Sequence, residues 1–197
     1  DDTKVILIED KVHTINHGNQ LERYYSILQE KYHIENIYPV YFKTGDQSNY
    51  KAIEKIGYKI FLRNNFIKVL NFGIEKEIKN EIFVDFNNHL KGIENSVQSY
   101  SNLPVKDWHW DSWKGFYLAL QSELQDGDWG YVPQRNGGFL GFWWYQDWKQ
   151  IKKDLGYEYY LQLEHGKFCF KMSPDKRENA EVTRSHFRGL LYPKAKE

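Results

Sequence analysis

The stretch Val5-Ile6-Leu7-Ile8-Glu9-Asp10-Lys11 decides the fold of this 197-residue chain. Its first four residues form a continuous apolar, mostly β-branched run, which predicts a strand at the centre of a sheet, buried on both faces. Side chains two positions apart in a strand point to the same face, so Glu9 and Lys11 are expected to leave the end of that strand together.

The residues that follow predict an α/β pattern around a mixed sheet. Apolar and tyrosine side chains recur at three- and four-residue spacings after Asn19, which we interpret as the N-cap of a helix over 20–32. Further along, strands are expected at 36–44 and 58–62, and helices at 64–72 and 78–97.

The last part of the chain has a different character. Ser101–Pro104 is the best internal break and separates a core (1–103) from a helix and an aromatic-rich antiparallel β elaboration (104–197), which we expect to pack on the same domain. The elements expected there are a helix at 111–124, strands at 129–132 and 138–145 joined by a turn at Asn136-Gly137, a hairpin of strands 157–163 and 167–172, and a closing helix at 175–190.

Composition excludes several classes of protein. Lys+Arg and Asp+Glu are both 27, which argues against a globally basic nucleic-acid coat and against a polyanionic tail. A single cysteine, Cys169, excludes a disulfide framework and favours the cytoplasm. No apolar run approaches the roughly 20 residues that span a bilayer, so no membrane is expected as a partner.

Glu9 and Lys11 suit phosphodiester hydrolysis. They end a strand at the sheet edge where α/β proteins place ligands. A carboxylate can hold Mg²⁺, and a lysine can neutralise developing charge or orient the attacking water. Gln20 and Tyr24, four apart on one helix face, can hydrogen-bond a phosphate, a water or a base edge. The alternative is an ordinary strand-end ion pair beside an amphipathic tyrosine.

These residues resemble a known family. The segments Ile6–Lys11 and Asn19–Tyr25 are similar to motifs of the PD-(D/E)XK nuclease superfamily, in particular its bacterial and phage branch with Glu-x-Lys and Gln-x-x-x-Tyr. The resemblance implies a restriction-endonuclease-like fold and Mg²⁺-dependent cleavage of DNA, with Mn²⁺ as a substitute. It implies Glu9 and the main-chain carbonyl of Asp10 as metal ligands, and Lys11 as the catalytic lysine. Gln20 and Tyr24 would support the site or contact the nucleic-acid backbone.

The family pattern also contains a metal-binding aspartate on the preceding strand. Here Asp1-Asp2-Thr3-Lys4 resembles the intervening hairpin turn, so we expect that aspartate upstream of Asp1. Otherwise the site is degenerate, and the chain is a nuclease-fold protein that binds nucleic acid or protein. The sequence leaves open whether cleavage is internal or from an end. It also leaves open whether the substrate is single- or double-stranded DNA.

Two further features have both a functional and a packing interpretation. Trp108, Trp110 and Trp113 could stack on bases, although aromatics at this density more often form a core. The segment 167–196 is rich in lysine and arginine, and could hold phosphates or form a solvated helix face.

Overall fold

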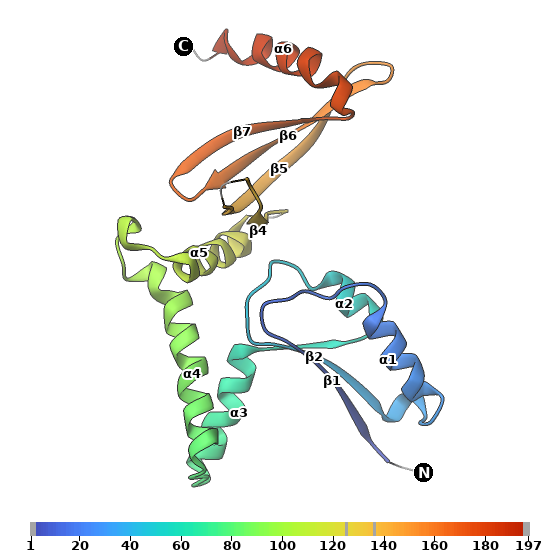
Figure 1. Ribbon diagram of the computed structural model, residues 1–197, viewed down its shortest axis with the longest axis vertical. Helices are drawn as coiled ribbons and strands as arrows, with labels where there is room; N and C mark the ends of the chain where they lie inside the picture. Colours follow the sequence, from blue (N-terminus) through green and yellow to red (C-terminus); the bar gives the residue numbers. More distant parts are fainter. Residues whose placement is uncertain (1–2, 125, 136, 195–197) are drawn as a thin grey trace. The chain divides into compact units, whose positions relative to one another are not determined.

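The chain folds into two compact units. The computed structural model describes residues 3–124, 126–135 and 137–194, and its contacts divide the chain into unit 1, Asp1–Phe116, and unit 2, Tyr117–Glu197. Figure 1 labels the α-helices and all strands except β3. The expected break at Ser101–Pro104 falls inside unit 1, in the turns that follow helix α4 (Glu81–Gln98).

Unit 1 is built on a three-stranded, wholly parallel sheet in the order β1-β2-β3. The strands are β1 (Val5–Lys11), β2 (Ile37–Lys43) and β3 (Lys59–Leu62). Parallel neighbours need crossover connections, and helices α1 (Gln20–Gln29) and α2 (Lys51–Ile56) supply them. The register pairs Glu9 with Tyr41 and Lys11 with Lys43. The carboxyl ends of β1 and β2 therefore lie side by side.

One face of this sheet carries the core of unit 1. Leu21 of α1 and Ile53 of α2 pack with Tyr41 and Tyr58, all of them buried, and Leu7 packs against this cluster. The hydroxyl of Tyr58 donates a hydrogen bond to the main-chain oxygen of Leu21 at 3.0 Å. Since Leu7, Glu9 and Lys11 share a face of β1, the two charged residues lie on the face that α1 covers.

The prediction that Val5–Ile8 is buried on both faces is wrong. Among the described residues β1 is an edge strand, and Ile6 and Ile8 are 66% and 59% exposed. The other face of the sheet is covered further along, where Phe66 of α3 (Arg63–Glu75) packs on Phe42 and Phe61. An apolar run cannot distinguish a strand covered on both faces from one covered on a single face.

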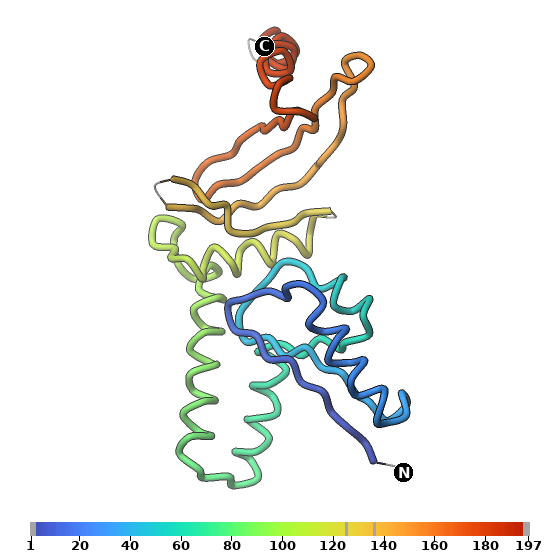
Figure 2. The backbone as a smooth tube through the Cα atoms, turned by 45° about the vertical axis from the view of Figure 1, so that its right-hand side comes forward, coloured from blue at the N-terminus to red at the C-terminus, as the bar shows by residue number. Residues whose placement is uncertain are grey.

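Helices α3 and α4 form an antiparallel pair, which Figure 2 shows as two adjacent coils. Phe66 and Phe86 are in edge contact across the pair. The helix α5 (Trp110–Glu123) follows α4, and the Cα of Gly115 lies so close to Val97 that a Cβ there would be 1.9 Å from the Val97 carbonyl oxygen. Trp108 and Trp113 pack edge to face, with ring centroids 4.8 Å apart, which favours the packing interpretation for both.

Unit 2 contains a four-stranded antiparallel sheet in the order β4-β5-β6-β7 and the closing helix α6 (Ala180–Leu191). The strands are β4 (Asp128–Val132), β5 (Phe139–Lys152), β6 (Leu155–Glu164) and β7 (Lys167–Pro174). The predicted hairpin around Glu164-His165-Gly166 is confirmed. Of the predicted Asn136-Gly137 turn, Asn136 lies outside the described residues.

The chain is therefore a mixed α/β protein with one parallel sheet and one separate antiparallel sheet. The central sheet was expected to be mixed and is wholly parallel among the described residues, while the expected antiparallel β part near the C-terminus is confirmed. Within the described residues, no helix has the length and apolar character needed to cross a membrane.

Candidate functional site

The charged end of β1 is the centre of the candidate site. Nζ of Lys11 lies 2.7 Å from Oε1 of Glu9, and both side chains are largely buried. The attraction between the two charges is stronger here than in a solvent-exposed ion pair, because water screens them less. The expectation that the two side chains leave the strand on one face is confirmed.

Helix α1 brings the amide and the phenol to the same place. Nζ of Lys11 donates to Oε1 of Gln20 at 3.3 Å, and Nε2 of Gln20 donates to Oη of Tyr24 at 3.4 Å. Because Gln20 and Tyr24 are one helical turn apart, a single amide can reach the strand with its oxygen and the phenol with its nitrogen. Glu9, Lys11, Gln20 and Tyr24 thus form a continuous chain of contacts.

The start of α1 places Gln20 in its first turn. Asn19 is at the N-cap position, as predicted, but its side chain makes no capping hydrogen bond; its main-chain oxygen instead accepts from the N–H of Arg23 at 3.0 Å. The helix ends at Gln29, three residues before the predicted end. Gln20 and Tyr24 both lie within the first five residues of α1, so the shorter helix still positions them.

The phenol of Tyr24 lies in a cationic setting. The hydrogen bond from Gln20 and the guanidinium of Arg23, whose Cζ is 5.2 Å from the ring centroid, lower the pKa of Tyr24 below its ordinary value of 10.0. The half-buried phenol is thereby made a better hydrogen-bond donor. Such a donor suits a phosphate oxygen or a water molecule.

Lys43 is a second lysine at this sheet edge, and sequence reasoning missed it. It is only 1% exposed and is the neighbour of Lys11 on the adjacent strand. Burial lowers the pKa of Lys43, and the nearby charge of Lys11 lowers it further, while Asp46 acts in the opposite direction. Its position at the end of an apolar strand was the one available signal.

Lys43 fastens the loop that leads from β1 to α1. Its ammonium donates to the main-chain oxygen of Thr14 at 2.6 Å, and the N–H of Thr44 donates to the main-chain oxygen of Lys11 at 3.2 Å. At Gly45 a Cβ would lie 2.2 Å from the Val12 carbonyl oxygen, so only glycine permits this approach. The loop is thus held against the end of β2, which fixes α1 relative to Lys11.

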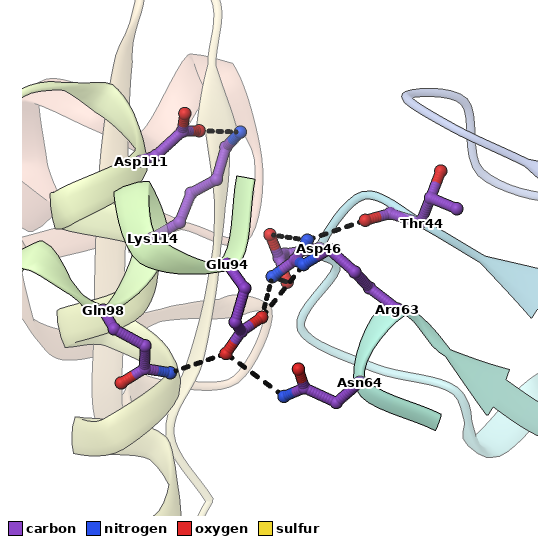
Figure 3. A network of polar contacts seen from close by, with 8 residues as sticks. All are labelled: Thr44, Asp46, Arg63, Asn64, Glu94, Gln98, Asp111 and Lys114. Atoms are coloured by element: carbon purple, nitrogen blue, oxygen red, sulfur yellow. Dashed lines mark hydrogen bonds and ion pairs between the residues drawn. The ribbon is translucent and has the colours of Figure 1, made fainter. Parts of the chain in front are cut away.

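A buried arginine, Arg63, holds the loop that follows β2 at this end of the sheet. Arg63, the first residue of α3, donates from Nη1 to the main-chain oxygen of Thr44 at 2.6 Å and makes two hydrogen bonds of 3.1 and 3.0 Å to the carboxylate of Asp46. Its Nε donates to Oε2 of Glu94 at 2.9 Å. Figure 3 shows Arg63 between these carboxylates. The guanidinium therefore joins the loop after β2 to helix α4.

Glu94 completes this network. Its Oε1 accepts hydrogen bonds from Asn64 at 3.1 Å and from Gln98 at 3.0 Å, also drawn in Figure 3. Burial raises the pKa of Glu94, but the hydrogen bonds from Arg63, Asn64 and Gln98 outweigh it, and the pKa falls below the ordinary value of 4.5. The carboxylate is charged at neutral pH and balances the buried guanidinium.

The donor atoms fit a hard divalent cation in part. Glu9 offers a carboxylate, and Mg²⁺ is commonly bound through one or two carboxylates together with water. Asp10 has an exposed side chain and lies on the other face of β1, so only its main chain could contribute, as expected. The described residues contain no cluster of three or more His, Cys, Asp or Glu side chains suited to a metal.

Comparisons with protein-family models, with curated proteins and with solved structures found no match for this chain.

Proposed function

We propose that this chain is a metal-dependent nuclease that hydrolyses phosphodiester bonds of DNA, with a restriction-endonuclease-like unit 1. The observation that supports the proposal is the continuous contact of Glu9, Lys11, Gln20 and Tyr24 at the carboxyl end of a parallel strand. A carboxylate, an amine, an amide and a phenol meet there, where α/β sheets place ligands.

Each residue has a role that follows from its chemistry. The carboxylate of Glu9 holds the divalent cation, Mg²⁺ or Mn²⁺, and the main-chain carbonyl of Asp10 is available as a further oxygen. When bound, such a cation supplies Lewis-acid polarisation of the phosphodiester. The ammonium of Lys11 faces the charge that develops on phosphate oxygens as water attacks phosphorus and the bond to the 3′ oxygen breaks. The proton that the water loses passes to solvent, and the leaving 3′ oxygen takes a proton from solvent to become a hydroxyl.

Gln20 and Tyr24 hold Lys11 and the bound strand in place, and neither takes part in breaking the bond. The amide of Gln20 fixes the ammonium of Lys11 from one side, while Glu9 holds it from the other. Tyr24, half-buried and with a lowered pKa, donates to a phosphate oxygen of the bound strand.

Substitution of the two charged residues tests the proposal. Glu9→Gln and Lys11→Met are expected to lower Mg²⁺- or Mn²⁺-dependent cleavage of plasmid and single-stranded DNA by about a hundredfold or more. Exposed residues of the same types provide matched controls: Glu30→Gln beyond α1 and Lys55→Met in α2. Circular dichroism verifies that each variant is folded. Full cleavage by both site variants would end the catalytic assignment.

A second candidate is a catalytically degenerate nuclease-fold protein that binds nucleic acid or protein. It is favoured by the metal chemistry, since no cluster of three metal-ligating side chains occurs in the described part of the chain. Calorimetric titration with Mg²⁺ and Mn²⁺ separates the candidates. Binding that is lost in Glu9→Gln supports the nuclease, whereas the absence of heat with wild-type protein supports the degenerate form.

A further inference from the structure

Unit 2 contains a groove that the proposed active site does not use. It has a volume of about 340 Å³ and lies against the four-stranded sheet and α6. This is the lower part of the size range of small-ligand pockets, roughly 300–1,000 Å³. The residues that line it come from β5, β6, β7, α6 and the turn after it, and include Tyr145, Lys149, Tyr159, Phe170, Lys171 and Lys194.

Aromatic rings dominate the lining, and some of them are open to solvent. Tyr145 is 69% exposed and Phe170 is 63% exposed, whereas Tyr157 at the other extreme is buried against Phe187. Exposed aromatic side chains gathered in one groove indicate a binding surface. Their apolar area is removed from water only when a partner covers them. Flat rings with hydroxyl groups suit a flat, polar-edged ligand.

The charged residues of the lining are all lysines. No carboxylate is among the lining residues that the structure describes. Lys171 is paired with Glu164, with Nζ 2.5 Å from Oε1. Lys149 and Lys194 make no direct ion pair with any described carboxylate, so neither ammonium is held by a close partner. Asp147, which accepts a hydrogen bond from Tyr159 at 2.8 Å, interacts with Lys149 over a longer distance. The groove therefore favours a ligand that is both aromatic and negatively charged.

The backbone at Tyr145 presents that ring in an unusual way. The register between β5 and β6 shifts between Trp144 and Asp147, which marks a β-bulge, and Tyr145 within it has φ of 59°. A tyrosine in the left-handed region is uncommon and is held there by its surroundings. Bulges of this kind redirect a side chain at binding sites. Here the redirected ring is the exposed tyrosine of the groove.

We propose that this groove binds single-stranded nucleic acid, with a base stacked on the ring of Tyr145 or Phe170 and phosphates on Lys149 and Lys194. Aromatic platforms beside a positively charged track are the general means of holding single strands without sequence preference. The proposal rests on the proposed function only for the kind of polymer, DNA. The single-stranded form follows from the exposed rings, because a base can stack on them only when it is not already stacked within a duplex. It concerns a site formed by unit 2 alone.

Binding is measured on the whole chain with a fluorescent oligothymidylate of about eight nucleotides, a length within the range that such platforms cover. Fluorescence anisotropy is recorded in EDTA, so that cleavage plays no part. Tyr145→Leu is expected to weaken binding by about five- to a hundredfold, the range found for removing one stacking ring. Tyr131→Leu, at a 57% exposed tyrosine of β4 outside the groove, is the matched control and retains affinity.

The charge contribution has its own test. Lys149→Gln is expected to reduce the slope of log affinity against log salt by about 0.7, the value for one phosphate contact on a single strand. Lys153→Gln, an exposed lysine outside the groove lining, leaves the slope unchanged.

The outcomes distinguish this proposal from that for the active site. Glu9→Gln is expected to bind the oligonucleotide as wild type does, so loss of cleavage with retained binding leaves the groove assignment intact. Equal affinity of wild type, Tyr145→Leu and Lys149→Gln would overturn it. So would the absence of binding to the oligonucleotide, or preferential binding of an acidic, aromatic peptide, which would make the groove a protein-docking site.

Discussion

Lys11 and Gln20 are joined by a hydrogen bond from Nζ to Oε1 of 3.3 Å, although nine positions separate them in the sequence. This contact ties the end of β1 to the first turn of α1. It also orients the amide of Gln20, because an amide that accepts from an ammonium with its oxygen must direct its nitrogen elsewhere, here to Tyr24.

The contact predicts a change in the titration of Tyr24. In Gln20→Leu the hydrogen bond to the phenol is lost, so the pKa of Tyr24 is expected to rise toward its ordinary value of 10.0. Nuclear magnetic resonance of the Tyr24 ring measures it. Gln29→Leu, at the exposed end of α1, leaves the titration as in wild type. An identical titration curve in Gln20→Leu would show that the amide does not reach the phenol.

Removal of the buried guanidinium is expected to be costly. Arg63→Met leaves the carboxylates of Asp46 and Glu94 and the main-chain oxygen of Thr44 without their donor. Breaking a buried pair in this way costs about 3–5 kcal/mol in the free energy of unfolding. Urea denaturation followed by circular dichroism measures the loss. Lys68→Met, on the exposed side of α3, is expected to change it by less than about 0.5 kcal/mol. Similar values for the two variants would refute the role assigned to Arg63.

The same network predicts acid sensitivity. The pKa of Glu94 is lower in the folded chain than its ordinary value of 4.5, so its contribution to stability is present above that value and is lost as the pH falls through the lowered pKa. Stability measured from neutral pH downward should therefore fall less steeply in Glu94→Gln than in wild type below about pH 5. Glu54→Gln, at an exposed position of α2, should follow the wild-type curve. Parallel curves for Glu94→Gln and wild type would contradict the lowered pKa.

Substitution of two glycines by alanine is expected to change the stability in opposite directions. Gly45→Ala places a Cβ 2.2 Å from a main-chain oxygen, so the loop after β1 must move, and we expect destabilisation of about 1–3 kcal/mol with loss of the Lys11–Gln20 contact. Gly92, in the interior of α4, has nothing within 4 Å of an added Cβ, and Gly92→Ala is expected to stabilise by up to about 1 kcal/mol. Thermal denaturation gives both signs, and a neutral Gly45→Ala would show that the approach of the loop is not tight.

The sequence was informative where a local period determines the outcome. The two-residue period of β1 was sufficient to place Glu9 and Lys11 on one face, and the helical period placed Gln20 and Tyr24 together. The side-by-side position of these two pairs needs the crossover of α1 onto the sheet. That crossover was expected from the order strand, turn, helix, strand.

Features that depend on tertiary contact were missed. Helix α2 has six residues and was not predicted, since so short a segment is stabilised by Ile53 in the core rather than by its own pattern. The pairing of Arg63 with Glu94 spans 31 positions and has no local signal. Likewise the aromatic residues of β5 to β7 were evident in the sequence, but the groove beside them depends on where α6 packs.

The exposed position of β1 has a practical consequence for work with this chain. Its outer row of main-chain N–H and C=O groups has no strand beside it among the described residues, and Ile6 and Ile8 flank that row. Such a row can pair with the same strand of a second molecule, so losses on concentration and slow aggregation in storage are to be expected. Dilute assays, or a charged substitution such as Ile6→Lys, keep the molecules apart while the opposite face of the strand retains its chemistry.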